Sequence, residues 1–147
     1  MGIIFLVDGK PMVFEAVSTV KFTPLDAWIA RGAKRHFVVK RLKAAPTAAD
    51  VVKLKKTLPT FKGRPYDLTF EWSDTRIYCS ELVWKIYERA LGTQIGMLTK
   101  LRDFDLTSPA VQKKIRERFG SNVPLDEMVI SPDAMFDSPL LTEVAHD

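Results

Sequence analysis

A single cysteine is the residue with the clearest reactive potential in this sequence. Cys79 lies near the start of the strongest helical pattern, which predicts a helix over residues 76–91. A helix N-terminus stabilises a thiolate through its unpaired N–H groups and its dipole, and the same N–H groups stabilise an oxyanion. Cysteine is also among the most buried residue types, and Cys79 shares the apolar stripe of this helix. The residue alone therefore fits both a nucleophile and a core side chain.

A nucleophilic cysteine requires a general base, and the chain contains only two histidines. His146 is the second-last residue, in a position where chain ends fray. His36 follows Lys34 and Arg35, whose charges disfavour an imidazolium, and is typical of a surface histidine. Neither is a convincing partner for Cys79. His36 remains an alternative base if its ring lies within hydrogen-bond reach of the sulfur.

Carboxylates are plentiful, and one of them stands in an unusual place. Glu15 lies among apolar residues in the strand pattern of residues 13–17. It is either on the solvent face, which the residues alone favour, or a buried functional acid. Glu81 is expected to complement the helix N-terminus. Asp67 and Asp74 are expected to be loop and capping residues.

Composition excludes several classes of protein and site. One cysteine excludes an internal disulfide and a Cys-rich zinc site, and no apolar run reaches the ~18 residues that span a bilayer. A net charge of +4, spread along the chain, predicts a solvated surface and no nucleic-acid partner. No phosphate-binding loop, dinucleotide fingerprint or metal-spaced histidine cluster is present, so we expect no cofactor and no metal. Association with a membrane is not expected, and no leader peptide is recognisable at residues 1–7.

The elements that position these residues predict one domain. Residues 2–17 indicate a β-hairpin around Asp8-Gly9, and the unbroken apolar run Ile3–Val7 is typical of a strand inside a sheet. Thr23 is predicted to cap a short helix that ends at Gly32. Further strands and extended segments are predicted at 20–23, 36–42, 68–72 and 129–130. Further helices are predicted at 47–58, where Thr47 can act as the cap, and at 108–120, opened by Ser108-Pro109, and a final turn or helix starts at 131. Gly92 is the predicted stop of the helix over 76–91. We therefore expect a single α+β domain over residues 1–147, with a small, mostly antiparallel sheet packed against helices.

Four short motifs resemble one known family. They are Tyr-Cys-Ser-Glu-Leu-Val-Trp at 78–84, Gly-Arg-Pro-Tyr-Asp at 63–67, Phe-Glu-Ala-Val at 14–17 and Ser-Pro-Asp at 131–133. Together they resemble the YiiX/YaeF group, circularly permuted relatives of the NlpC-type papain-like cysteine hydrolases, over nearly the whole chain. The resemblance implies a permuted papain-like fold, with Cys79 as the nucleophile at a helix N-terminus and Glu15 as the polar third member of a triad.

The resemblance also implies a histidine that the sequence does not contain. In the family this residue stands two positions before the Gly-Ile pair that opens the first hairpin strand. That pair is Gly2-Ile3 here, so the histidine would immediately precede Met1. The family further carries an export leader, a strand and a helix upstream. We therefore expect a chain that is shortened relative to the family, cytoplasmic as printed, and periplasmic or exported if a leader belongs to it.

Two functions from different classes follow. The first is a thiol amidase or peptidase that acts on an amide or ester of a cell-wall peptide or a lipid, with very low activity without its base. The alternative is a non-catalytic domain that binds a peptide or lipid in a pocket around Cys79, Tyr66 and Trp72. In either case an exposed sheet edge is expected to favour a homodimer.

Overall fold

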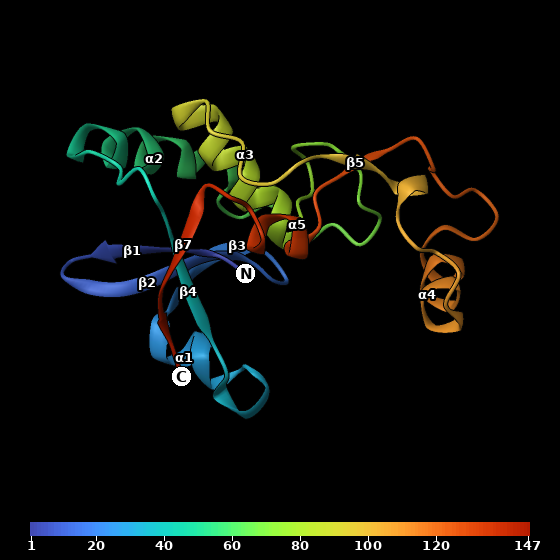
Figure 1. Cartoon of the computed structure of the whole chain (residues 1–147), viewed down its shortest axis with the longest axis horizontal. Helices are drawn as coiled ribbons and strands as arrows, with labels where there is room; N and C mark the ends of the chain where they lie inside the picture. The colour runs from blue at the N-terminus through green and yellow to red at the C-terminus, as the bar shows by residue number, and fades with distance from the viewer.

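Three antiparallel strands near the N-terminus form the sheet on which the site is built (Figure 1). The computed structural model describes residues 1–147. The strands are β1 (Ile3–Val7), β2 (Lys10–Ala16) and β3 (Val20–Pro24), in the order β1–β2–β3. The predicted turn at Asp8-Gly9 is confirmed, since both residues have positive φ, 50° and 75°. That conformation matches the twist of a two-residue hairpin.

The prediction that the first strand is an interior strand is wrong for this chain. β1 is bonded to β2 alone and forms an edge of the sheet. Ile3 and Phe5 are buried, whereas Ile4 and Leu6 are 39% and 63% exposed. The uniform apolar run hid this alternation, because every position carries the same kind of side chain.

Two helices cover one face of the sheet (Figure 1). They are α2 (Ala48–Phe61), which Thr47 caps as predicted, and α3 (Cys79–Leu91), which ends at Gly92. α2 runs beyond its predicted end and contains Pro59, whose missing N–H removes one backbone hydrogen bond from the last turn. The core between helices and sheet is formed by buried apolar side chains, among them Phe14, Ala16, Leu54, Leu58, Phe61, Leu82 and Ile86.

The opposite side of the sheet carries α1 (Leu25–Ala30) and a short 3₁₀ turn, η1 (Ala33–Arg35) (Figure 1). The predicted helix is present, but Thr23 does not cap it, because no side chain caps this N-terminus. Thr23 belongs to β3, and its hydroxyl donates a hydrogen bond to Glu15 instead.

A second, two-stranded ribbon joins distant parts of the chain. β4 (Val38–Leu42) pairs antiparallel with β7 (Leu141–His146), and the two cross the sheet region in Figure 1. β4 was predicted, but β7 was not. His146 was expected in a frayed tail and instead pairs with Val38 in this ribbon.

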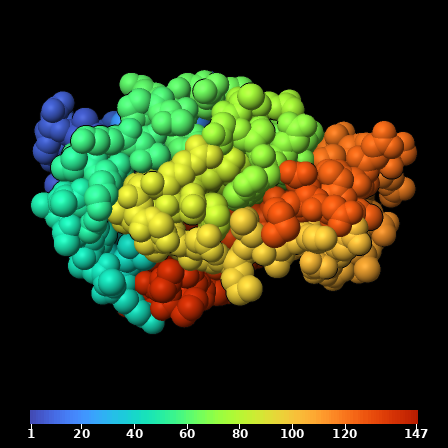
Figure 2. Space-filling view, turned by 90° about the horizontal axis from the view of Figure 1, so that it is seen from above, coloured from blue at the N-terminus to red at the C-terminus, as the bar shows by residue number.

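The segment of residues 99–129 extends toward one end of the long axis, away from the β1–β2 turn (Figures 1 and 2), whereas α5 (Pro132–Phe136) lies beside α3. α4 (Pro109–Phe119) lies at this end and is capped by Ser108, as predicted. The other elements of this part of the chain are β5 (Thr99–Lys100), η2 (Leu101–Asp103) and β6 (Met128–Val129). None of the helices combines the length and hydrophobicity that crossing a membrane requires.

Residues 62–78 form the loop that leads into α3. The predicted extended segment 68–72 is not a strand, and Phe70 adopts a positive φ of 55°. The base of the loop is closed by a parallel bridge between Tyr66 and Ile77. This closure brings Tyr66 beside the start of α3.

Candidate active site

Cys79 is the first residue of α3 and lies where two cavities meet. Its side chain is half-buried. The first N–H groups of a helix have no intrahelical acceptor, so the sulfur is adjacent to unpaired donors and to the positive end of the helix. A carbonyl brought to this sulfur would therefore also meet groups that stabilise negative charge on its oxygen.

The first cavity has a volume of about 530 Å³ and carries polar groups. Glu15, Arg31, His36 and Tyr66 share its wall with Cys79. The other lining residues are Met1, Ala16, Val17, Trp28 and Gly32. Two of the residues that the sequence predicted to be catalytic, Cys79 and Glu15, are thus brought to one cavity from α3 and β2.

The second cavity, about 570 Å³, is largely apolar, with 13 hydrophobic residues among the 19 that line it. One wall is the apolar face of α4, which presents Val111, Ile115 and Phe119. Phe70 and Phe104 contribute aromatic rings from the loops. Cys79 and Tyr66 line both cavities, so these two residues stand at the junction between them.

Glu15 is buried, with 2% of its surface exposed, so the favoured expectation of a solvent-facing acid is wrong. The Thr23 hydroxyl donates to Oε1 over 2.6 Å. The guanidinium of Arg31 donates to Oε1 and Oε2 over 2.5 and 2.7 Å. These partners neutralise the carboxylate and fix its orientation toward the cavity.

Tyr66 reaches Cys79 from the base of the 62–78 loop. Burial, together with the neighbouring thiol of Cys79, raises the pKa of the Tyr66 hydroxyl to about 12. The hydroxyl is therefore protonated near neutral pH and can donate a hydrogen bond beside the sulfur.

The backbone around Cys79 is held on both sides. Tyr78 accepts a hydrogen bond from the Ile130 N–H at 3.1 Å, and the Ser80 hydroxyl donates to the Ile130 carbonyl at 2.8 Å. Glu81 accepts from the Tyr78 N–H at 3.3 Å, as expected of an acid in the first turn. These hydrogen bonds hold the backbone of the helical turn that carries Cys79.

Neither histidine hydrogen-bonds to Cys79. His36 lines the same cavity, but it is exposed and its Nδ1 lies 2.7 Å from Asp147 Oδ1. Nδ1 of His146 lies 2.7 Å from Glu143 Oε1 at the surface.

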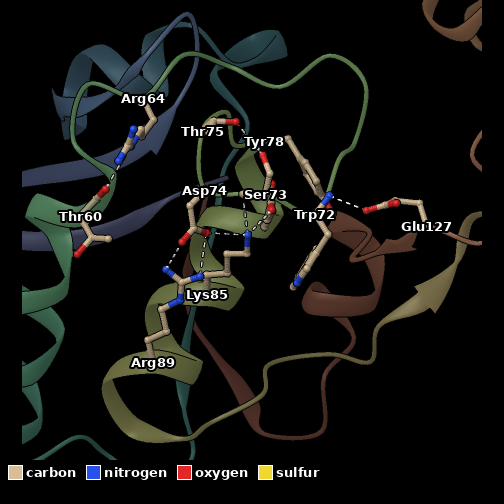
Figure 3. A network of polar contacts seen from close by, with 11 residues as sticks. Thr60, Arg64, Trp72, Ser73, Asp74, Thr75, Tyr78, Lys85, Arg89 and Glu127 are labelled. Carbon is tan, nitrogen blue, oxygen red and sulfur yellow. Dashed lines mark hydrogen bonds and ion pairs between the residues drawn. The ribbon is translucent and has the colours of Figure 1, made fainter.

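Trp72, predicted to bind substrate with Tyr66, lines neither of these two cavities. Its ring packs edge-on against Trp84, with centroids 5.3 Å apart, and its backbone N–H donates to Glu127 (Figure 3). Trp72 therefore fixes the loop rather than contacting the cavities at Cys79.

Sequence reasoning missed Arg31, Thr23 and the apolar cavity. No pattern marks Arg31, because its partner is 16 residues away on another element. The apolar cavity did leave a signal, since Val111, Ile115 and Phe119 recur every four residues along α4 and form one stripe.

Comparison with known proteins identifies the family. A family model described as "Permuted papain-like amidase enzyme, YaeF/YiiX, C92 family" matches residues 1–145. The uncharacterized protein YiiX of Escherichia coli K12 is 50% identical over 146 residues, which cover 99% of this chain and 72% of the relative. A crystal structure described as metalloprotein yiiX from Escherichia coli O157:H7 is 49% identical, with a TM-score of 0.96 over 99% of this chain and 81% of that one. The fold implied by the sequence motifs is confirmed, and the chain belongs to the permuted papain-like amidase family YaeF/YiiX.

Proposed function

We propose that the protein is a cysteine amidase in which Cys79 attacks the carbonyl of an amide or ester. The observation that carries this proposal is the meeting of three features at one point: the thiol at the start of α3, a buried carboxylate in the wall of the same cavity, and an apolar cavity that opens at the sulfur. The family to which the chain belongs supports chemistry of this kind.

The chemistry follows from the positions of the groups. The general base takes the thiol proton of Cys79, the thiolate adds to the carbonyl carbon, and the N–H groups at the start of α3 stabilise the oxyanion. The hydroxyl of Tyr66, a residue that lines both cavities together with Cys79, would donate a hydrogen bond to the same oxygen. Collapse of this intermediate releases the amine or alcohol, which takes a proton from the general base, and leaves an acyl thioester on Cys79. Water then hydrolyses the thioester.

We propose that the general base is the imidazole of a histidine immediately before Met1, and that Glu15 orients this imidazole. Strand β1 pairs Ile3 with Phe14, so the same register extended backwards places Gly2 opposite Glu15. A Cβ built on Gly2 would lie 3.1 Å from the Glu15 Cβ, which supports this register. Because side chains alternate along a strand, a residue preceding Met1 would share the face of Glu15 as its diagonal neighbour, within reach of a ring. Met1 itself lines the cavity that contains Cys79.

His36 is the second candidate base, because it lines the cavity with Cys79 and already has a carboxylate partner in Asp147. It would have to leave its exposed position and approach the sulfur before it could accept a proton. We therefore rank it below an imidazole placed next to Glu15.

The apolar cavity supports an acyl group as the part of the substrate that binds beside Cys79. Its aliphatic and aromatic lining suits a hydrocarbon chain or an apolar peptide side chain. The polar cavity on the other side of the sulfur would take the leaving group. A lipid amide or ester and a peptide with an apolar acyl side both fit this division.

A metal centre does not fit the residues of this chain, although the related crystal structure is described as a metalloprotein. No three His, Cys, Asp or Glu side chains converge closely enough to hold a metal ion. The proposed steps therefore use none.

The test compares two extended chains that differ in one residue. One carries histidine before Met1 and the other carries glutamine, each behind a new initiator methionine. We expect the histidine form to hydrolyse p-nitrophenyl esters and N-acyl anilides at least about 100-fold faster, since a positioned base contributes ~10²–10⁴-fold. Cys79→Ala should abolish this activity, and His36→Gln should leave it within about twofold. Equal rates for the histidine and glutamine forms would contradict the proposed base.

A non-catalytic binding domain is the competing function, and the apolar cavity is the observation that favours it. It predicts saturable binding of a fatty acyl amide to both extended chains, with no product from either. Release of product that depends on Cys79 would exclude it.

A further inference from the structure

A buried lysine in the middle of α3 has three polar partners that the proposed chemistry does not use. The Lys85 side chain is only 4% exposed. Its Nζ lies 2.7 Å from the Ser73 carbonyl oxygen and 3.0 Å from Asp74 Oδ1 (Figure 3). The third partner is Glu81, whose Oε1 lies 2.7 Å from Nζ. The ammonium also lies 4.7 Å from the centroid of the Trp72 ring.

One of these partners connects Lys85 to the backbone at Cys79. Glu81 is fully buried, and while Oε1 faces Lys85, Oε2 accepts the hydrogen bond from the Tyr78 N–H. Tyr78 immediately precedes Cys79. The position of the ammonium therefore fixes a carboxylate that in turn fixes the peptide at the first turn of α3.

The other two partners connect Lys85 to the 62–78 loop. Ser73 and Asp74 lie near the middle of this loop (Figure 3), whose base is closed where Ile77 donates to Pro65. Tyr66 stands at that base. Arg89 holds Asp74 as well, through two hydrogen bonds of 2.8 and 2.9 Å, but it makes no contact with Glu81. Lys85 thus contacts both segments that contribute to the site: the first turn of α3, which carries Cys79, and the 62–78 loop, which carries Tyr66.

Stability alone is a poor explanation for this arrangement. A buried ion pair loses much of its Coulombic gain to desolvation, and an apolar pair of similar size is often as stable or more stable. What the pair supplies is the placement of specific atoms: Lys85 donates hydrogen bonds to Ser73 and Asp74 and forms an ion pair with Glu81. The other carboxylate oxygen of Glu81 accepts from the Tyr78 N–H.

We propose that Lys85 is a positioning residue for Cys79, acting through Glu81 on the first turn of α3 and through Ser73 and Asp74 on the loop that carries Tyr66. This inference rests on the proposed function of Cys79. It predicts that loss of the ammonium lowers the reactivity of the thiol, even in a variant that remains as stable as the parent.

The test is the rate of Cys79 alkylation by iodoacetamide between pH 5 and 10. For Lys85→Met we expect the rate at pH 7 to fall about tenfold and the pH of half-maximal rate to rise by about one unit, because the turn that stabilises the thiolate is no longer held. Arg89→Met loosens Asp74 but not Glu81, so it should stay within about twofold of the parent. Glu81→Gln keeps an acceptor for the Tyr78 N–H and should also stay within about twofold.

The double variant Glu81→Gln/Lys85→Met controls for a folding defect, since it leaves no buried charge without a partner and keeps an acceptor for the Tyr78 N–H. We expect it to unfold in urea no earlier than the parent and to show the same tenfold loss as Lys85→Met. A parental alkylation profile in the folded double variant, or an equal loss in Arg89→Met, overturns the inference.

Iodoacetamide reacts with the thiolate directly and needs neither substrate nor base. A chain that shows the predicted shift in alkylation but never turns over a substrate would refute the proposed amidase and support the positioning role. Turnover that depends on Cys79, together with an unchanged alkylation profile in the Lys85 variants, would support the proposed amidase and refute the positioning role of Lys85.

Discussion

The residue scale explains how a carboxylate can stand inside a strand. Glu15 is tolerated because Thr23 and Arg31 satisfy both of its oxygens while its surface is almost fully covered. A buried carboxylate without such partners would be too costly to keep ionised. A glutamate at this apolar strand position therefore indicated a buried site with hydrogen-bond partners for its carboxylate.

Gly2 permits the close approach of β1 to Glu15. A Cβ at this position would lie 2.5 Å from Val13 Cγ1 and 2.8 Å from the Phe14 carbonyl oxygen. We expect Gly2→Ala to lower the free energy of unfolding by about 1–3 kcal/mol, because backbone and core atoms have to move. Urea unfolding measures this change. Leu6→Ala, at an exposed position of the same strand, should change it by no more than about 0.5 kcal/mol. Equal effects of the two substitutions would show that the close approach is not a constraint.

The buried carboxyl of Glu81 is expected to make the stability of the protein depend on pH. Burial raises the pKa of the Glu81 carboxyl to about 7 from its ordinary value of 4.5, against the opposing effect of Lys85. The folded state therefore binds more protons than the unfolded state between these values, so stability should fall as the pH rises from about 4.5 to 7, by up to about 3 kcal/mol. Urea unfolding at pH 5 and pH 7.5 measures the difference.

Glu81→Gln should remove this slope, whatever it does to absolute stability, because a glutamine does not titrate. Glu117→Gln, at an exposed position of α4, should keep it. A slope that survives in Glu81→Gln would assign the pH dependence to another group.

At the scale of elements, the start of α3 is hydrogen-bonded to Ile130, the residue that directly follows β6. Ile130 uses both of its backbone polar groups, to Tyr78 on one side of Cys79 and to Ser80 on the other. All three residues are buried. The link holds the N-terminus of α3 against a segment about 50 residues further along the chain.

We expect Ser80→Ala and Tyr78→Phe each to destabilise the fold by about 1–2 kcal/mol, because each leaves a buried backbone group of Ile130 without its partner. Thermal unfolding followed by circular dichroism measures the loss. Ser121→Ala, at an exposed position, is the control and should have little effect. If Ser80→Ala unfolds at the same temperature as the control, the hydrogen bond from Ser80 to Ile130 does not contribute to stability.

Elements with local signals were predicted from the sequence, and elements that depend on distant partners were not. The caps Thr47 and Ser108 and the stop Gly92 mark real helix ends, because capping involves neighbours in the chain. β7 was missed because its side chains are mostly exposed and its partner β4 lies about 100 residues away. The extended segment at 68–72 is a loop instead, because its backbone bonds to side chains and not to a neighbouring strand: the Thr69 N–H donates to Asp67 and the Trp72 N–H donates to Glu127.

The same distinction applies to the site. Cys79, Glu15 and Tyr66 were predicted through family motifs, and the structure brings all three to one cavity. Arg31 was not predicted, because an ion pair between separate elements leaves no periodic trace. Trp72 was assigned to the pocket from its position near the motif, but its side chain packs on Trp84.

On the scale of the whole molecule, the exposed edge of β1 remains a proposed site of dimerisation. β1 has a free edge, and Ile4 and Leu6 are exposed on it. An unprotected edge strand of this kind pairs readily with another chain. We expect a dimer in sedimentation velocity at high concentration, converted to monomer by Leu6→Lys. Val52→Lys, at an exposed apolar position on α2, should leave the dimer intact. A monomer at every concentration would contradict this expectation.

The proposed nucleophile is tested most directly by locating the acyl group during turnover. The chain extended by histidine is mixed with p-nitrophenyl octanoate, quenched in acid within seconds, digested and mapped by mass spectrometry. We predict one octanoyl group on the peptide that contains Cys79, removable by hydroxylamine as a thioester and absent in Cys79→Ala. Release of nitrophenol with no acyl group on Cys79, or with acylation only at another residue, would contradict its role as the nucleophile.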